Sequence, residues 1–115
     1  MESEFIGYPY YHGSLDRKQA EQALNDSKRD GAFIIRDGKD GINSNSPYTV
    51  SVWYKRPWHL QMKRRSQGKI ALGALKEGEK LFNSPLELVQ YHQENTLILQ
   101  GSGKVCLTIP APVFS

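Results

Sequence analysis

The sequence predicts an α+β fold in which a central antiparallel β-sheet carries one α-helix on each face. Two segments, one near each end of the chain, begin with patterns typical of helix N-termini. Between them lie several short segments with the alternating apolar and polar residues of β-strands. One of these, residues 32–36, is apolar on both alternating faces, as expected for a strand that is covered on both sides.

The first helix is expected to begin directly after Asp16. Gln19 stands three residues later, which is the spacing of a capping box. The apolar residues then follow at helical spacing, at Ala20, Ala23 and Leu24. The polar run 25–27 is expected to end this helix.

The segments between the two helices read as strands and turns. The strand 32–36 follows a turn signal at Asp30-Gly31, and a polar loop rich in glycine and asparagine comes after it. The expected elements after that strand are the loop 37–47, the strands 48–54 and 58–63 joined by a turn at 55–57, and short β segments at 69–72 and 80–82.

The second helix has a clear N-terminal pattern. Ser84 is the expected cap, Pro85 the first helical residue, and Glu87 lies three residues after the cap. A last short strand is expected at 105–109, stopped by Pro110.

The length of 115 residues suits one domain. We expect residues 1–7 to be a flexible extension, native or added for expression. Residues 8–112 are then the domain and residues 113–115 a tail. The domain is expected to be monomeric.

Composition limits the partners and the compartment. The formal charge of +3 is a mild excess that favours an anionic partner without selecting one. Cys106 is the single cysteine, so no internal disulfide is expected. Without a signal-peptide pattern or an apolar run of roughly 20 residues, a cytoplasmic location is expected. The sequence carries no motif for a nucleophile with a positioned base, so we expect no enzyme, no metal and no cofactor.

Arg36 does not fit the buried strand that it ends. Strand alternation places it on the same face as Ala32 and Ile34, where a guanidinium is costly unless it is paired. It could emerge at the strand end, or pair with a carboxylate such as Asp37. The loop after it favours another reading, because its backbone N–H groups, beginning at Gly38, can surround an anion. Arg36 and this loop would then form a phosphate socket.

Further polar side chains could reach this socket. Arg17 lies in the first turn of the first helix, where the helix N-terminus itself favours anions. Thr49 and His59 lie on the polar faces of the next two strands. In a sheet that is antiparallel in chain order, both would converge near Arg36.

The chain resembles the Src homology 2 (SH2) family from about Tyr10 to Ile109. The strand signature Phe-Leu-Val-Arg of that family corresponds to Phe33-Ile34-Ile35-Arg36 here. The other segments that carry the resemblance are Tyr11-His12-Gly13, Asp16-Arg17, Pro47 to Val52 and Phe82 to Tyr91. The stretches 16–21 and 70–73 are most similar to the leukocyte adaptor branch of the family.

The resemblance implies a phosphotyrosine-binding site. Arg36 matches the arginine that contacts the phosphate with two hydrogen bonds, and Arg17 matches the helix arginine that contacts phosphate and the tyrosine ring. His59 and Thr49 match residues that line the pocket. Lys39 matches the first position of the phosphate-binding loop, which donates its backbone N–H.

The chain departs from the family pattern at three positions. Gly38 replaces a serine that donates to the phosphate, and Gln61 replaces a basic residue, so the socket should be weakened. Leu60 replaces an aromatic residue of some members and should favour apolar residues after the phosphotyrosine. Leu97 is expected to be exposed to the same region, which the loops 74–81 and 95–104 should wall.

These features predict a non-catalytic module that recruits its parent protein to tyrosine-phosphorylated partners in signalling. Two alternatives keep the fold: binding of an unmodified peptide, or weak contact of Lys63-Arg64-Arg65 with an acidic membrane. An RNA-binding sheet is less favoured, because both faces of the middle strand are covered. No nucleic-acid partner is therefore expected.

Overall fold

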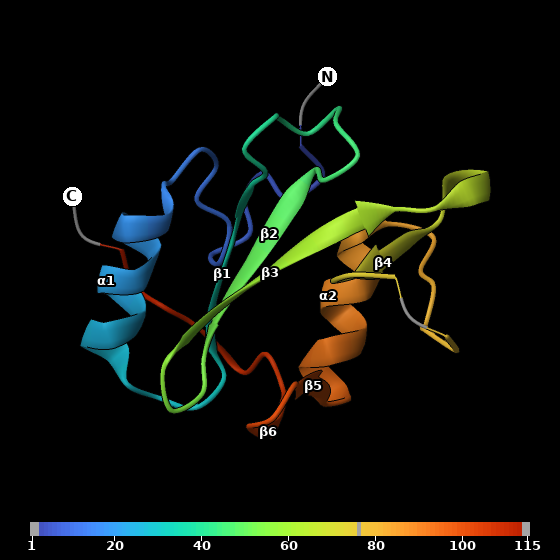
Figure 1. Cartoon of the computed structure of the whole chain (residues 1–115). Helices are drawn as coiled ribbons and strands as arrows, with labels where there is room; N and C mark the ends of the chain where they lie inside the picture. The colour runs from blue at the N-terminus through green and yellow to red at the C-terminus, as the bar shows by residue number, and fades with distance from the viewer. Residues whose placement is uncertain (1–2, 76, 114–115) are drawn as a thin grey trace.

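The computed structural model describes residues 3–75 and 77–113 and confirms the α+β class (Figure 1). A five-stranded sheet has the order β4-β3-β2-β1-β7, with α1 on one face and α2 on the other. The elements are α1 (Arg17–Ser27), β1 (Ala32–Asp37), β2 (Tyr48–Trp53), β3 (Pro57–Arg64), β4 (Ile70–Leu72), α2 (Pro85–Glu94), β5 (Leu97–Leu99), β6 (Gly103–Val105) and β7 (Ile109–Pro110). A short 3-10 turn, η1 (Ser66–Gly68), joins β3 to β4.

β1 lies inside the sheet, as its apolar faces predict. Phe33 and Ile35 pack into the core on the α2 side, whereas Ala32 and Ile34 pack against α1. All four side chains are 0% exposed. Arg36 follows them on the α1 side of the sheet. Because the strand is buried, the side chain of Arg36 starts below the protein surface.

The sheet is antiparallel in chain order from β1 to β4. β7 is the exception, because it pairs with β1 in parallel, with Ala32 opposite Ile109. The sheet is therefore mixed at this edge.

Both helices begin where their caps predict. The Asp16 carboxylate accepts a hydrogen bond from the Gln19 backbone N–H at 2.7 Å, and the Gln19 side chain accepts from the Asp16 N–H at 3.3 Å. The Ser84 hydroxyl accepts from the Glu87 N–H at 3.1 Å. These bonds satisfy backbone donors that a helix start would otherwise leave unpaired.

Residues 3–7 correct the expectation of a flexible extension. Phe5 is 0% exposed, and its ring contacts Tyr10 and Tyr48. The Glu4 carboxylate accepts a hydrogen bond from the Leu86 N–H at 3.0 Å, which ties this segment to the start of α2. Phe5 buries a whole aromatic ring, which outweighs the entropy of leaving the segment free. At the other end, Val113 packs against the α1 cluster.

The C-terminal part also differs from its prediction. The expected strand 105–109 is interrupted: Val105 ends β6, and Ile109 begins β7. Between them, the Leu107 N–H donates to the His92 carbonyl and the Thr108 N–H to the Gly31 carbonyl. The expected loop 95–104 contains the β5-β6 hairpin, and the expected β segment 80–82 is reduced to one bridge, from Phe82 to Ile70.

Neither helix in the described part of the chain is long and apolar enough to cross a membrane.

Candidate functional site

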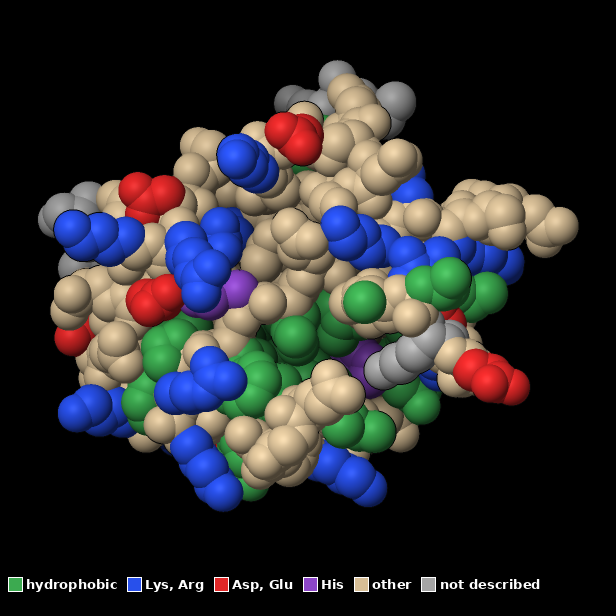
Figure 2. Space-filling model, in the orientation of Figure 1, with side chains coloured by type: hydrophobic (Ala, Val, Ile, Leu, Met, Phe, Trp, Pro, Cys, Tyr) green, Lys and Arg blue, Asp and Glu red, His purple; other side chains and the backbone are tan. Residues whose placement is uncertain are grey.

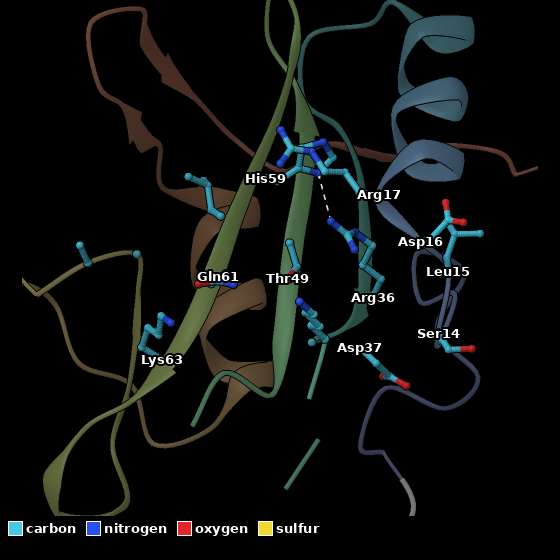
Figure 3. A pocket seen from close by; sticks show the side chains of 15 residues that line it. Ser14, Leu15, Asp16, Arg17, Arg36, Asp37, Thr49, His59, Gln61 and Lys63 are labelled. Atoms are coloured by element: carbon cyan, nitrogen blue, oxygen red, sulfur yellow. Dashed lines mark hydrogen bonds between the residues drawn. The ribbon is translucent and has the colours of Figure 1, made fainter. Parts of the chain in front are cut away.

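A cavity of about 760 Å³ lies on the α1 side of the sheet (Figure 3). The first turn of α1, the strands β1 to β3, the start of the loop after β1, and residues 73–74 after β4 all contribute to its lining. The residues named in advance that line it are Arg17, Arg36, Gly38, Lys39, Thr49, His59, Leu60, Gln61 and Lys63. One helix and three strands thus bring together positions that are far apart in sequence.

The convergence of the strand residues follows from the register. Arg36 lies opposite Thr49, and Thr49 lies opposite Gln61. Ser51 lies opposite His59 in the same way. Because side chains alternate along a strand, all five point to one face of the sheet.

Arg36 is half-buried, and its guanidinium points along the cavity toward His59 (Figure 3). Its Nε donates to the Ser51 hydroxyl at 3.0 Å. Burial lowers the pKa of Arg36, and the nearby positive charge of Arg17 lowers it further. Within residues 3–75 and 77–113, no carboxylate forms an ion pair with Arg36.

Asp37 does not serve as the partner of Arg36 that one reading of the sequence considered. Its carboxylate accepts a hydrogen bond from the Tyr11 hydroxyl at 2.5 Å. Burial, followed by this hydrogen bond, raises the pKa of Tyr11 to about 12. The Asp37 carboxylate thus binds the Tyr11 hydroxyl and forms no ion pair with Arg36.

Ser51 is a site residue that the sequence prediction left out. It is 0% exposed, and its hydroxyl lies 3.0 Å from Arg36 Nε and 2.8 Å from His59 Nδ1. Its alternation with Thr49 along one strand was the signal that could have identified it. Thr49 itself is 6% exposed and forms part of the cavity wall.

His59 is held from both sides of its ring. Nδ1 faces the Ser51 hydroxyl, and Nε2 lies 3.2 Å from Glu21 Oε1. Burial lowers the pKa of His59, as do the charges of Arg36 and Arg17, while Glu21 opposes this shift. The ring is therefore neutral at neutral pH.

Arg17 reaches the site from the first turn of α1. Its side chain is 72% exposed, and its Nε donates to Glu21 Oε1 at 3.0 Å, one helical turn later. This hydrogen bond, more than any other influence, lowers the pKa of Glu21. Glu21 is the second residue that the prediction omitted, although its spacing of four from Arg17 was visible.

The loop after β1 is closed by its own hydrogen bonds. The Gly38 N–H donates to the Pro47 carbonyl at 2.8 Å, and the Gly41 N–H to the Gly38 carbonyl at 3.0 Å. A Cβ added at Gly38 would lie 1.9 Å from the Ser46 carbonyl oxygen. The loop as folded therefore has no room for the serine that many family members carry.

The expected position of Leu97 is incorrect. Leu97 is 3% exposed and belongs to the core on the α2 side, because β5 turns it inward. Leu60 is half-buried and lines the cavity, while Gln61 is exposed and lines it too. Their role in peptide specificity stays a prediction.

Each cation of the basic run 63–65 has a contact of its own within the domain. The Lys63 ammonium donates to the Ser46 hydroxyl at 2.7 Å, and Arg64 donates to the carbonyls of Ile42 and Ser44. Arg65 pairs with Glu79 at 2.7 Å, with side chains that are 17% and 9% exposed. The three cations thus have three separate structural contacts.

Comparison with known proteins identifies the family. The SH2 domain family model matches residues 10–92. The chain belongs to the SH2 domain family. The resemblance to this family that the sequence predicts is therefore confirmed.

This SH2 domain is similar to parts of larger proteins. It is 42% identical over 104 residues to B-cell linker protein of Mus musculus, which covers 89% of this chain and 22% of that protein. The identity to B-cell linker protein of Rattus norvegicus is 41%, with the same coverage. Tyrosine-protein kinase TXK of Mus musculus is 36% identical over 95 residues, or 76% of this chain and 16% of that protein. The chain thus spans about a fifth of the linker proteins that it matches.

Proposed function

We propose that this SH2 domain is a non-catalytic module that binds phosphotyrosine and recruits its parent protein to tyrosine-phosphorylated partners in signalling. The observation that carries the proposal is Arg36, a half-buried cation in a cavity with no carboxylate partner among the described residues. Its membership of the SH2 family supports the same function. The proposal places the domain in the cytoplasm, as a monomer.

The chemistry of Arg36 suits a phosphate. A phosphotyrosine carries a charge of about −1.5 to −2 and three acceptor oxygens. A guanidinium can donate two parallel hydrogen bonds to such a group, which an ammonium cannot. Nε of Arg36 already donates to Ser51, whereas Nη2 makes only a long contact with His59 Nδ1, at 3.4 Å. The terminal nitrogens are therefore the proposed donors to the ligand.

Selectivity for phosphotyrosine comes from depth in this proposal. Arg36 follows four fully buried residues of β1, so its side chain starts from the floor of the cavity, below the surface of the protein. A phosphate on a phenyl ring reaches that depth, whereas a phosphoserine does not. Arg17, Thr49 and His59 would line the path of the ring.

The loop after β1 is proposed to supply fewer hydrogen bonds to the phosphate than in members with the full family pattern. The Gly38 N–H is already bonded to Pro47, and no serine fits beside it. Lys39, the next residue, lines the cavity and is the proposed loop donor. Gln61 supplies no charge, but Lys63 lines the cavity two residues further along the same strand. We therefore expect phosphate binding to depend strongly on Arg36 and Arg17.

The residues after the phosphotyrosine are proposed to cross β3. Figure 2 shows basic side chains around a histidine, beside a region of hydrophobic side chains on the same face. Leu60 lines the cavity and packs against the core, and Ala74 lines the cavity after β4. Leu97 is excluded from this role by its burial. An apolar preference after the phosphotyrosine is the expected result.

The test is a titration with two peptide pools of identical composition, one phosphorylated on tyrosine and one not. Binding should be confined to the phosphorylated pool. Arg36→Lys should weaken it by at least about tenfold, because a charged hydrogen bond and the paired geometry are lost. Equal binding to both pools would contradict the phosphate requirement and favour an unmodified peptide. Binding to acidic vesicles alone would point to a membrane partner.

A further inference from the structure

Glu21 joins two basic side chains of the proposed site through one oxygen. Its Oε1 lies 3.0 Å from Arg17 Nε and 3.2 Å from His59 Nε2. The His59 side chain is 9% exposed, whereas that of Arg17 is 72% exposed. The carboxylate thus connects a well-buried ring to a side chain that is otherwise largely in solvent.

The hydrogen-bonding partners decide which nitrogen of His59 carries the proton. The ionised carboxylate of Glu21 can only accept, so Nε2 of the neutral ring must be the donor. Nδ1 is then an acceptor, and the hydroxyl of Ser51 donates to it at 2.8 Å. The oxygen of Ser51 in turn accepts from Arg36 Nε at 3.0 Å.

These bonds form one continuous chain between the two arginines. It runs from Arg36 through Ser51 and His59 to Glu21, where Arg17 joins from the other side. We call Ser51, His59 and Glu21 the Nε relay. Figure 3 shows the side chain of Arg17 beside that of His59, and a hydrogen bond between the Arg36 guanidinium and His59. Each arginine donates Nε to the relay, and Nη2 of Arg36 also lies 3.4 Å from His59 Nδ1.

We propose that Glu21 is a positioning residue for phosphotyrosine binding: it holds Arg17 over the pocket and selects the His59 tautomer that supports Arg36. This inference rests on the proposed function and names a residue of the same site that acts through its neighbours.

Two effects of Glu21 on a bound phosphate oppose each other. Its negative charge repels the phosphate, but it lies at the surface, where solvent screens charges, and it is already bonded to two donors. Glu21 also restricts the rotamers of Arg17, so the exposed arginine loses less conformational entropy when it binds phosphate. Solvent does not screen this entropic effect. The positioning effect should therefore be the larger one.

The first test compares the affinity of wild type, Glu21→Ala, Glu21→Gln and Asp26→Asn for one phosphotyrosine peptide. Asp26→Asn is the matched control, since it removes the same charge from α1 at a residue bonded only to Gln22 among the described side chains. Glu21→Ala should bind about three- to tenfold more weakly, the range expected for one arginine side chain that is no longer pre-oriented. Glu21→Gln should lose less, because its amide oxygen still accepts one of the two bonds. Thermal unfolding of each variant checks that the domain is folded.

The second test measures the His59 tautomer by ¹⁵N NMR in the free protein at neutral pH. Wild type and Asp26→Asn should show the proton on Nε2, and Glu21→Ala should lose this preference. A merely structural role of Glu21 would not move this signal.

The outcomes separate this inference from the proposed function. Tight binding by wild type with equal or tighter binding by Glu21→Ala would overturn the inference alone, and so would a wild-type His59 protonated on Nδ1. Wild type that binds no phosphotyrosine peptide would overturn the proposed function and this inference with it.

Discussion

At the scale of single residues, the buried hydroxyl of Ser51 links the Arg36 guanidinium to the His59 ring. Both hydrogen bonds lie beneath the proposed phosphate socket. Because Ser51 is 0% exposed, water cannot easily replace the hydroxyl if it is removed.

Ser51→Ala should therefore lower stability and weaken phosphotyrosine binding together. We expect a loss of about 1–3 kcal/mol in the free energy of unfolding. Arg36 Nε would lose its partner, and His59 Nδ1 would keep only the 3.4 Å contact with Arg36 Nη2. Urea unfolding measures the first effect and peptide titration the second. Ser66→Ala, at an exposed position, is the control. Unchanged stability in Ser51→Ala would contradict the role of this hydroxyl.

Gly38 shows that a family residue cannot always be restored. A side chain here would meet the Ser46 carbonyl oxygen at 1.9 Å, and backbone atoms cannot move aside without shifting the loop. Gly38→Ser should destabilise the domain by about 1–3 kcal/mol, as overpacking does, and should not strengthen phosphate binding. Chemical denaturation and the same titration test this, with Asn43→Ser at an exposed loop position for comparison. Tighter binding at full stability would show that the loop adapts.

At the scale of elements, the segment between β4 and α2 is attached to the end of β3 by a nearly buried ion pair. Arg65 donates to both oxygens of Glu79, at 2.7 Å and 3.1 Å, and to the Gly73 carbonyl at 3.1 Å. Leu75 in this segment is 77% exposed. The pair thus sets the position of a segment that borders the cavity at residues 73–74.

Arg65→Met should loosen this segment. We expect a loss of about 2 kcal/mol, between the values for exposed and for fully buried ion pairs, because Glu79 keeps its burial but loses the arginine. Hydrogen exchange should become faster for residues 70–75 and 77–82, more than elsewhere in the domain. Arg29→Met, which removes an exposed arginine, is the control. An equal increase in exchange rate across the whole domain, or no increase, would mean that the ion pair has no local effect.

At the scale of the whole molecule, burial lowers the pKa of both His12 and His59. His12 Nε2 is buried, with no hydrogen-bond partner in the described part of the chain. When the domain unfolds, both rings return to a pKa of about 6.5 and bind protons more readily. Near and below that pH, the unfolded state therefore binds more protons than the folded state, which favours unfolding.

The stability of the domain should thus fall as the pH is lowered from about 7 to about 5. Glu21, whose pKa is lowered, loses its contribution only at lower pH, so it does not mask this window. Urea midpoints measured across the window test the sign. His12→Gln should make the decline shallower, since it removes one of the two groups. A constant or rising midpoint toward pH 5 would contradict the direction of both shifts.

Much of the fold could be predicted because its signals are local. The caps at Asp16 and Ser84 and the apolar faces of β1 each lie within a few residues of the element they define. The convergence of Arg36, Thr49 and His59 also followed from strand alternation, once the strands were ordered antiparallel.

The sequence by itself therefore determined both helices, the strands β1 to β3 with their faces, and the family, because capping hydrogen bonds and side-chain alternation act over short distances. Only the tertiary structure decided which apolar residues are buried and which polar ones meet. Phe5 and Leu97 look like members of loose segments, yet each is covered by residues far away in the chain. Glu21 and His59 are 38 residues apart, and only the packing of α1 against the sheet brings one carboxylate oxygen within 3.2 Å of the ring.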